Sequence, residues 1–125
     1  MNIFVTGGCG FIGSNFVIDQ INRGNKILNF DKLTYAANQD NLLAINQKSN
    51  YYFINGDIQD SEKISIEINK FSPDIIINFA AESHVDRSID GPQEFIDTNI
   101  VGTYKLLQSS LSYYNSLSLE SKKIF

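Results

Sequence analysis

Several residue types are scarce in this chain of 125 residues, and each scarcity narrows what the chain can do. A single cysteine, Cys9, excludes an internal disulfide, and together with the one histidine it offers no ligand set for a metal ion. The ten Lys and Arg residues form no basic stripe and the net charge is −4, which argues against nucleic acid as a partner. No apolar run approaches the roughly 20 residues that a membrane helix needs, and no signal-peptide pattern opens the chain. We therefore expect a cytoplasmic protein without membrane contact.

The chain does contain two alternating hydrophobic periods. Apolar runs at 3–6, 26–31, 51–54 and 75–81 predict four strands. Helical patterns at 11–22 and 60–71 lie between them, and a polar stretch at 32–50 carries one helical turn near 42–45. Strands that alternate with helices predict an α/β fold in one domain, a Rossmann-type doubly wound parallel sheet in the order 3-2-1-4.

The second half of the chain carries three further structural signals. The almost continuous apolar run at 75–81 predicts a strand buried on both faces. Gly91-Pro92 opens a long helix whose apolar residues repeat every 3.6 positions, namely Ile96, Ile100, Tyr104, Leu107 and Leu111. Residues 123–125 predict the start of a fifth strand.

Three glycines, Gly7, Gly10 and Gly13, follow the first predicted strand. The sharp turn into a helix needs positive φ at Gly7, a pyrophosphate against the backbone needs Gly10, and close packing of the helix on the sheet needs Gly13. The helix start then offers unpaired amides and a positive dipole end to an anion. This spacing is a variant of the dinucleotide fingerprint, and it carries weight because the required strand and helix flank it.

Two carboxylates follow the next two predicted strands. Asp31 ends the second strand, 18 residues after Gly13, where it would accept hydrogen bonds from an adenosine ribose. Its charge would repel the 2′-phosphate of NADP, so we favour NAD; the alternative is a solvated aspartate at a strand end. Asp57 and Ile58 follow the third strand and offer a polar anchor and an apolar wall for adenine. The alternative for Asp57, or for Asp60, is a helix N-cap.

The segment 79–88 follows the fourth predicted strand, and a dense polar cluster lies just beyond its two alanines at 80 and 81. In open α/β sheets, ligands bind beyond the carboxyl ends of strands where the strand order reverses, which is between the first and fourth strands here. Two alanines permit close approach of a cofactor, and the polar residues beyond them form a candidate substrate edge. In the alternative interpretation His84 is structural, and Asp86 and Arg87 pair with each other or with neighbours.

Three more polar positions have two interpretations each. Thr98 and Asn99 interrupt the apolar face of the long helix, where they must find partners either in a cofactor or in the backbone of a neighbouring segment. Cys9 lies near a helix start, where the pKa of a thiol tends to fall. A redox role and a small residue that simply fits are therefore both open for Cys9.

Taken together, five segments resemble one enzyme family. TGGCGFIGS, DKLTYAAN, GDI, FAAESHVDRSI and DTNIVGTY are similar to the dTDP-glucose 4,6-dehydratases, members of the extended short-chain dehydrogenase/reductase superfamily. The resemblance covers the whole chain, which corresponds to about the first third of such an enzyme. The first segment is shared across the superfamily, whereas DKLTYA and AESHVDRSI are much more specific. Cys9 is a departure, since alanine is usual there.

The resemblance implies an NAD site and a reaction. Bound NAD takes a hydride from sugar C4, water is lost across C5 and C6, and the hydride returns to C6 to give a 4-keto-6-deoxy sugar nucleotide. Ser83 and His84 would face the hexose of dTDP-glucose. The implied NAD-binding residues are Gly7, Gly10, Phe11, Ile12 and Gly13 at the phosphate loop; Asp31, Lys32, Leu33 and Thr34 at the adenosine end; Asp57 and Ile58 at the adenine; and Phe79, Ala80, Ala81, Glu82, Ser83 and Thr98 beside the nicotinamide half.

The catalytic residues of that reaction are not found in this chain. Oxidation in the family uses a Tyr-x-x-x-Lys pair, and none of the six tyrosines has a lysine four residues later. We expect an N-terminal NAD-binding portion that is inactive alone, from an enzyme that forms homodimers through the long helix. Two alternatives stay open, a stand-alone nucleotide-binding module and a fragment of another sugar-nucleotide epimerase or decarboxylase. The apolar run at 75–81 argues against the module, because it would leave an exposed sheet edge.

Overall fold

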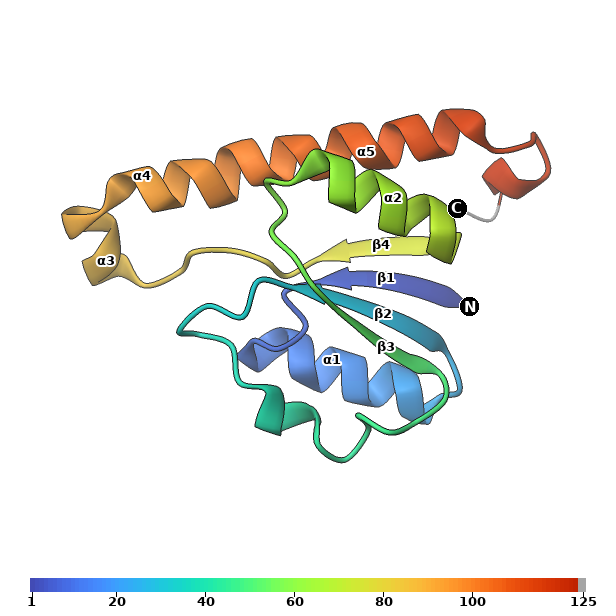
Figure 1. The fold of residues 1–125 in the computed structure, drawn as a ribbon, viewed down its shortest axis with the longest axis horizontal. Helices are drawn as coiled ribbons and strands as arrows, with labels where there is room; N and C mark the ends of the chain where they lie inside the picture. Colours follow the sequence, from blue (N-terminus) through green and yellow to red (C-terminus); the bar gives the residue numbers. More distant parts are fainter. Residues whose placement is uncertain (124–125) are drawn as a thin grey trace.

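Four parallel strands form one sheet in the order β3-β2-β1-β4 (Figure 1). The structure is a computed structural model that describes residues 1–123, apart from the side chains at positions 85, 87 and 123. The predicted α/β fold and strand order are confirmed. The strands are β1 (Asn2–Thr6), β2 (Lys26–Asp31), β3 (Tyr51–Asn55) and β4 (Ile75–Asn78). The helices are α1 (Phe11–Asn22), α2 (Ser61–Phe71), α3 (Val85–Asp90), α4 (Pro92–Phe95), the π-helical η2 (Ile96–Gly102) and α5 (Thr103–Ser116), with 3₁₀ turns η1 (Gln39–Leu42) and η3 (Ser121–Lys123).

Helices cover both faces of the sheet, with α1 on one face and α2 and α5 on the other (Figure 1). Successive side chains of a strand point to opposite faces, so β1 contributes to two cores. Val5 packs with the buried Val17 of α1 on one side, and Phe4 packs with Ile64 and Leu106 on the other. This three-layer arrangement leaves the carboxyl ends of the strands open at one edge.

The helices in the N-terminal half of the chain lie close to the positions that the sequence predicted. Helix α1 has the predicted bounds, and α2 begins at Ser61 because the Asp60 carboxylate accepts a hydrogen bond from the Lys63 amide at 3.0 Å. Asp60 is therefore the N-cap of α2. The short helical turn lies at Gln39–Leu42, a few residues before the predicted 42–45.

The prediction for the fourth strand was wrong in its length and in its burial. β4 ends at Asn78 instead of 81, because β1 ends at Thr6 and its chain turns away into the glycine loop. The three isoleucines of β4 are half-buried, not covered on both faces. Within the described residues β1 is the neighbour of β4 in the sheet, so β4 forms an edge.

The long helix predicted from Gly91-Pro92 is present as α4, η2 and α5 in succession (Figure 1). Its buried residues are Gly102, Leu106, Ser109 and Tyr113. The apolar stripe that identified the helix in the sequence lies outside, at 46–63% exposure: Ile96, Ile100, Tyr104, Leu107 and Leu111.

The C-terminal end of the described chain is a 3₁₀ turn. The predicted strand at 123–125 is not seen at Lys123, which ends the 3₁₀ turn η3; 124 and 125 lie outside the described residues. None of the helices described is long and apolar enough to cross a membrane.

Candidate functional site

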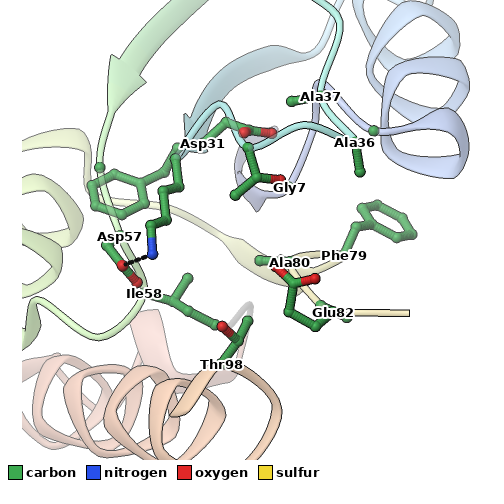
Figure 2. Close-up of a pocket in the computed structure, with 16 residues that line it drawn as sticks. Gly7, Asp31, Ala36, Ala37, Asp57, Ile58, Phe79, Ala80, Glu82 and Thr98 are labelled. Atoms are coloured by element: carbon green, nitrogen blue, oxygen red, sulfur yellow. Dashed lines mark ion pairs between the residues drawn. The ribbon is translucent and has the colours of Figure 1, made fainter. Parts of the chain in front are cut away.

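A cleft opens at the carboxyl ends of the strands, at the point where the strand order reverses between β1 and β4 (Figure 2). The empty space within the cleft and at its open side together measures about 560 Å³. Its lining comes from the loops that follow all four strands and from η2: Gly7, Gly10, Phe30, Asp31, Lys32, Thr34, Ala36, Ala37, Gly56, Asp57, Ile58, Phe79, Ala80, Ala81, Glu82 and Thr98.

The three glycines of the first loop have different structural roles. Gly7 has φ +68°, and a Cβ there would lie 2.5 Å from the Ala80 nitrogen. A Cβ on Gly13 would lie 2.3 Å from the Gly7 carbonyl oxygen, so Gly13 permits α1 to pack against the loop itself. A Cβ on Gly10 would meet its nearest neighbour at 3.4 Å, an ordinary contact distance. The protein therefore requires Gly7 and Gly13 for its own packing, whereas Gly10 keeps space in the cleft open.

Side chains of β2 hold the glycine loop in place. The Gly8 amide donates to Asn29 Oδ1 at 3.0 Å, and the Cys9 amide donates to Asp31 Oδ2 at 2.8 Å. Helix α1 then begins after Gly10 without a side-chain cap. Since the first amides of a helix have no acceptor within the helix, this end of α1 is electrostatically suited to an anion.

Asn29 was missed by the sequence analysis, although a polar residue inside an apolar strand is a signal that could have found it. It is fully buried, and its Nδ2 donates to the Tyr51 hydroxyl at 3.1 Å and to Cys9 Sγ at 3.3 Å. Burial raises the pKa of Tyr51 to about 12. Asn29 thus joins the glycine loop to β2 and β3 through one buried polar group.

The expectation of a lowered thiol pKa at Cys9 was wrong. Cys9 is fully buried, and burial together with the nearby Asp31 carboxylate raises the pKa of the thiol to about 11. A thiol with a raised pKa is a poor nucleophile at neutral pH. The structure therefore favours the interpretation of Cys9 as a small residue that fits.

Asp31 lies beside the glycine loop and is 6% exposed, so it is not a solvated residue at a strand end. Oδ1 accepts from the Leu33 amide at 2.8 Å, while Oδ2 accepts from Cys9. A carboxylate offers about four lone-pair sites. The two backbone bonds therefore fix the orientation of Asp31 and leave capacity for hydroxyl donors in the cleft that Asp31 lines.

An ion pair joins the ends of β2 and β3 at one side of the cleft (Figure 2). Lys32 Nζ lies 2.7 Å from Asp57 Oδ2, and this partner raises the pKa of Lys32 above its ordinary value. Asp57 Oδ1 also accepts from the Gln59 amide at 2.9 Å, in a local turn. Next to it, Ile58 is buried and presents an apolar surface to the cleft.

The loop after β4 is held by η2. The Glu82 amide donates to Asn99 Oδ1 at 2.8 Å, and Asn99 Nδ2 donates to the Glu82 carbonyl at 2.8 Å. Asn99 therefore serves the backbone of this loop, whereas its neighbour Thr98 lines the cleft. The backbone alternative is therefore realised by Asn99, whereas contact of Thr98 with a cofactor stays a prediction.

The residues singled out in the sequence separate into two groups. Twelve of them line the cleft: Gly7, Gly10, Asp31, Lys32, Thr34, Asp57, Ile58, Phe79, Ala80, Ala81, Glu82 and Thr98. Six do not line it: Phe11, Ile12, Gly13, Leu33, Ser83 and His84. The side chains of Phe11 and Ile12 point outward at 84% and 69% exposure, so their contribution to an anion site would come from backbone amides.

Other outcomes concern the edges of the site. Ser83 and His84 are exposed beyond the cleft, and the suggested pairing of Asp86 with Arg87 involves a side chain outside those described. The sequence analysis missed four lining residues, Phe30, Ala36, Ala37 and Gly56. The two adjacent alanines were a usable signal, because small side chains permit close approach of a ligand.

A parallel sheet with a glycine loop at its switch point has the arrangement of a Rossmann-type fold, the class in which nucleotides bind at this edge of the sheet. The family model described as GDP-mannose 4,6 dehydratase matches residues 4–124, and the chain belongs to this family. Among curated relatives, it is 47% identical over 113 residues to the dTDP-glucose 4,6-dehydratase of Xanthomonas campestris pv. campestris (strain B100), covering 90% of this chain and 32% of that protein. It is 48% identical over 126 residues to an Escherichia coli dTDP-glucose 4,6-dehydratase, covering 100% of this chain and 35% of that protein.

Solved structures agree with these relatives. DesIV from Streptomyces venezuelae, a dTDP-glucose 4,6-dehydratase with NAD and TYD bound, has a TM-score of 0.84 and 42% identity over 90% of this chain and 36% of its own. The UDP-glucose 4-epimerase of Thermus thermophilus in complex with NAD has a TM-score of 0.80 and 29% identity, covering 90% of this chain and 34% of its own. The resemblance inferred from the motifs is confirmed, and the chain spans about a third of the length of these relatives.

Proposed function

We propose that this chain is the NAD-binding part of a dTDP-glucose 4,6-dehydratase. The observation that carries the proposal is the buried Asp31, which is hydrogen-bonded to the glycine loop and lines the cleft beside it. Relatives named dTDP-glucose 4,6-dehydratase at 45–49% identity, and a DesIV structure with NAD bound, support it. An epimerase is the weaker alternative, because the epimerase structures are 27–34% identical.

The chemistry of the cleft fits NAD in each of its parts. The open space at Gly10 and the uncapped start of α1 suit a diphosphate. Asp31 suits the adenosine ribose, and Asp57 with Ile58 suits the adenine. The nicotinamide half would lie along 79–83 and Thr98. When bound, NAD would accept and return a hydride.

The same residues favour NAD over NADP. The Asp31 carboxylate would repel a 2′-phosphate placed at the ribose. A nearby cation would be needed to hold that phosphate, but Lys32 is already paired with Asp57 at 2.7 Å. The Asp31 carboxylate and the ion pair of Lys32 with Asp57 therefore both disfavour NADP.

For the whole enzyme, we propose a lyase that converts dTDP-glucose to its 4-keto-6-deoxy product in the cytoplasm, as a homodimer. Ser83 and His84, which are exposed beyond the cleft and follow its lining residue Glu82 in the chain, would face the hexose. The Tyr-x-x-x-Lys pair that oxidation needs does not occur among these 125 residues. We therefore expect the chain by itself to bind NAD without turning over the sugar nucleotide.

Isothermal titration of the purified chain with NAD and NADP, next to an assay for product from dTDP-glucose, tests this function. The proposal predicts saturable NAD binding, at least about 10-fold weaker NADP binding because of the charge at Asp31, and no product. Equal affinity for the two cofactors would contradict the role of Asp31. Product formation by the chain alone would contradict its assignment as the cofactor-binding part.

A further inference from the structure

Tyr35 links two loops that come from opposite sides of the cleft. Its hydroxyl donates to Glu82 Oε2 at 3.0 Å, and its ring lies 5.4 Å from the ring of His84. Tyr35 belongs to the loop after β2, and Glu82 belongs to the loop after β4. Because β1 lies between β2 and β4 in the sheet, this link spans the end of β1, where the glycine loop begins.

The Glu82 end of the link is fixed. The backbone of Glu82 makes two hydrogen bonds of 2.8 Å with Asn99, a residue of η2. Its side chain therefore extends from a segment that is already held on a helix. A hydrogen bond to such a point restrains whatever group donates it.

The Tyr35 end lies in a loop without regular secondary structure. This loop is held where it begins, by the Leu33 amide on Asp31, and where it ends, by the Asn38 amide on the Cys9 carbonyl at 3.0 Å. Between these two points, Thr34, Ala36 and Ala37 line the cleft. Tyr35 therefore ties the middle of the loop to the far wall, where Glu82 also lines the cleft.

We propose that Tyr35 is a positioning residue that, through Glu82, closes a strap across the bound dinucleotide and slows its release. This inference rests on the proposed function. A ligand that runs from Asp31 to Glu82 along the end of β1 would lie beneath the link, so the two loops must separate for it to leave. The strap contributes to retention of NAD and not to folding, because Tyr35 is a loop residue with 46% exposure.

The test compares Tyr35→Phe with the wild-type chain. The substitution removes the hydroxyl and keeps the ring beside His84. We expect NAD to dissociate about 3- to 10-fold faster in stopped-flow displacement, which is the effect of one partly exposed hydrogen bond. Hydrogen exchange should increase at 33–37 and 81–84, while the melting temperature changes by no more than about 2 °C.

Tyr52→Phe is the matched control, because Tyr52 is 43% exposed on β3 and does not line the cleft. Combining Tyr35→Phe with Glu82→Ala separates the link from other effects, since the double variant should release NAD no faster than Glu82→Ala alone. An unchanged release rate in Tyr35→Phe, with NAD still bound by the wild type, would overturn the strap and leave the proposed function intact. Failure of the wild-type chain to bind NAD would overturn both.

Discussion

The side chain of Asp31 has a structural role and a proposed binding role at the same time. Its two oxygens hold the amides of Cys9 and Leu33, so that the glycine loop and the loop after β2 are both fixed by one carboxylate. Because the group is buried, its remaining lone pairs are directed by these bonds and not by solvent. A ribose would thus meet a preorganised acceptor, which lowers the entropic cost of binding.

At Cys9, the raised thiol pKa predicts a loss of stability in alkaline solution. The folded chain keeps the proton up to about pH 11, while the unfolded chain loses it near the ordinary value of 9.0. The contribution of the protonated, buried Cys9 thiol to the free energy of unfolding is therefore complete below pH 9, and it is lost as the pH rises towards 11. Urea unfolding at pH 8 and pH 10.5 should show that Cys9→Ala loses about 1–2 kcal/mol less than the wild type over this interval.

Tyr51 titrates in the same direction, with a pKa raised to about 12 chiefly by burial, and it is present in both proteins, so the main part of its contribution is common to them. Rapid alkylation of the folded wild type by iodoacetamide at pH 8 would contradict the burial of Cys9. An equal loss of stability in both proteins would contradict the raised pKa.

At the scale of the element, the glycine loop makes separate demands at its separate positions. Gly10→Ala should fold normally, because its φ of −73° suits alanine and its new Cβ would meet the nearest atom at 3.4 Å. It should still weaken NAD binding by about 10-fold or more, since the methyl group enters the space proposed for the diphosphate. Gly13→Ala should instead destabilise the chain by about 1–3 kcal/mol, because its Cβ would lie 2.3 Å from a backbone oxygen.

Thermal unfolding and NAD titration of both variants distinguish these effects. The account requires that Gly10→Ala lose affinity with its melting temperature retained, and that Gly13→Ala lose melting temperature. If Gly10→Ala bound NAD as tightly as the wild type, the diphosphate could not lie against that position.

The C-terminal helix shows which part of an element the sequence could not predict. The 3.6-residue repeat correctly located a helix from Pro92 onward, but the repeat lies on the exposed side, while Gly102, Leu106 and Tyr113 face the core. A periodic pattern identifies a helix, and the neighbours of the helix decide which face is buried.

For the molecule as a whole, the alternation of strands and helices was sufficient to predict the sheet order, because right-handed crossovers leave few arrangements. The glycine spacing with Asp31 also located the cleft. Local patterns could not predict contacts that depend on three-dimensional packing. Two such contacts join segments that are distant in the sequence, namely the buried network around Asn29 and the link from Tyr35 to Glu82. The end of β4 at Asn78 likewise depends on where the neighbouring strand β1 ends.

The central claim is that the Asp31 carboxylate binds the adenosine ribose of NAD beside the glycine loop. The measurement that tests it most directly is the NAD dissociation constant of Asp31→Ala against the wild type, with Asp19→Asn on the exposed face of α1 as the control. Loss of a hydrogen bond to a charged group should weaken NAD by about 10- to 100-fold, and circular dichroism confirms that the variant is folded. A folded Asp31→Ala variant that binds NAD as tightly as the wild type would contradict the account.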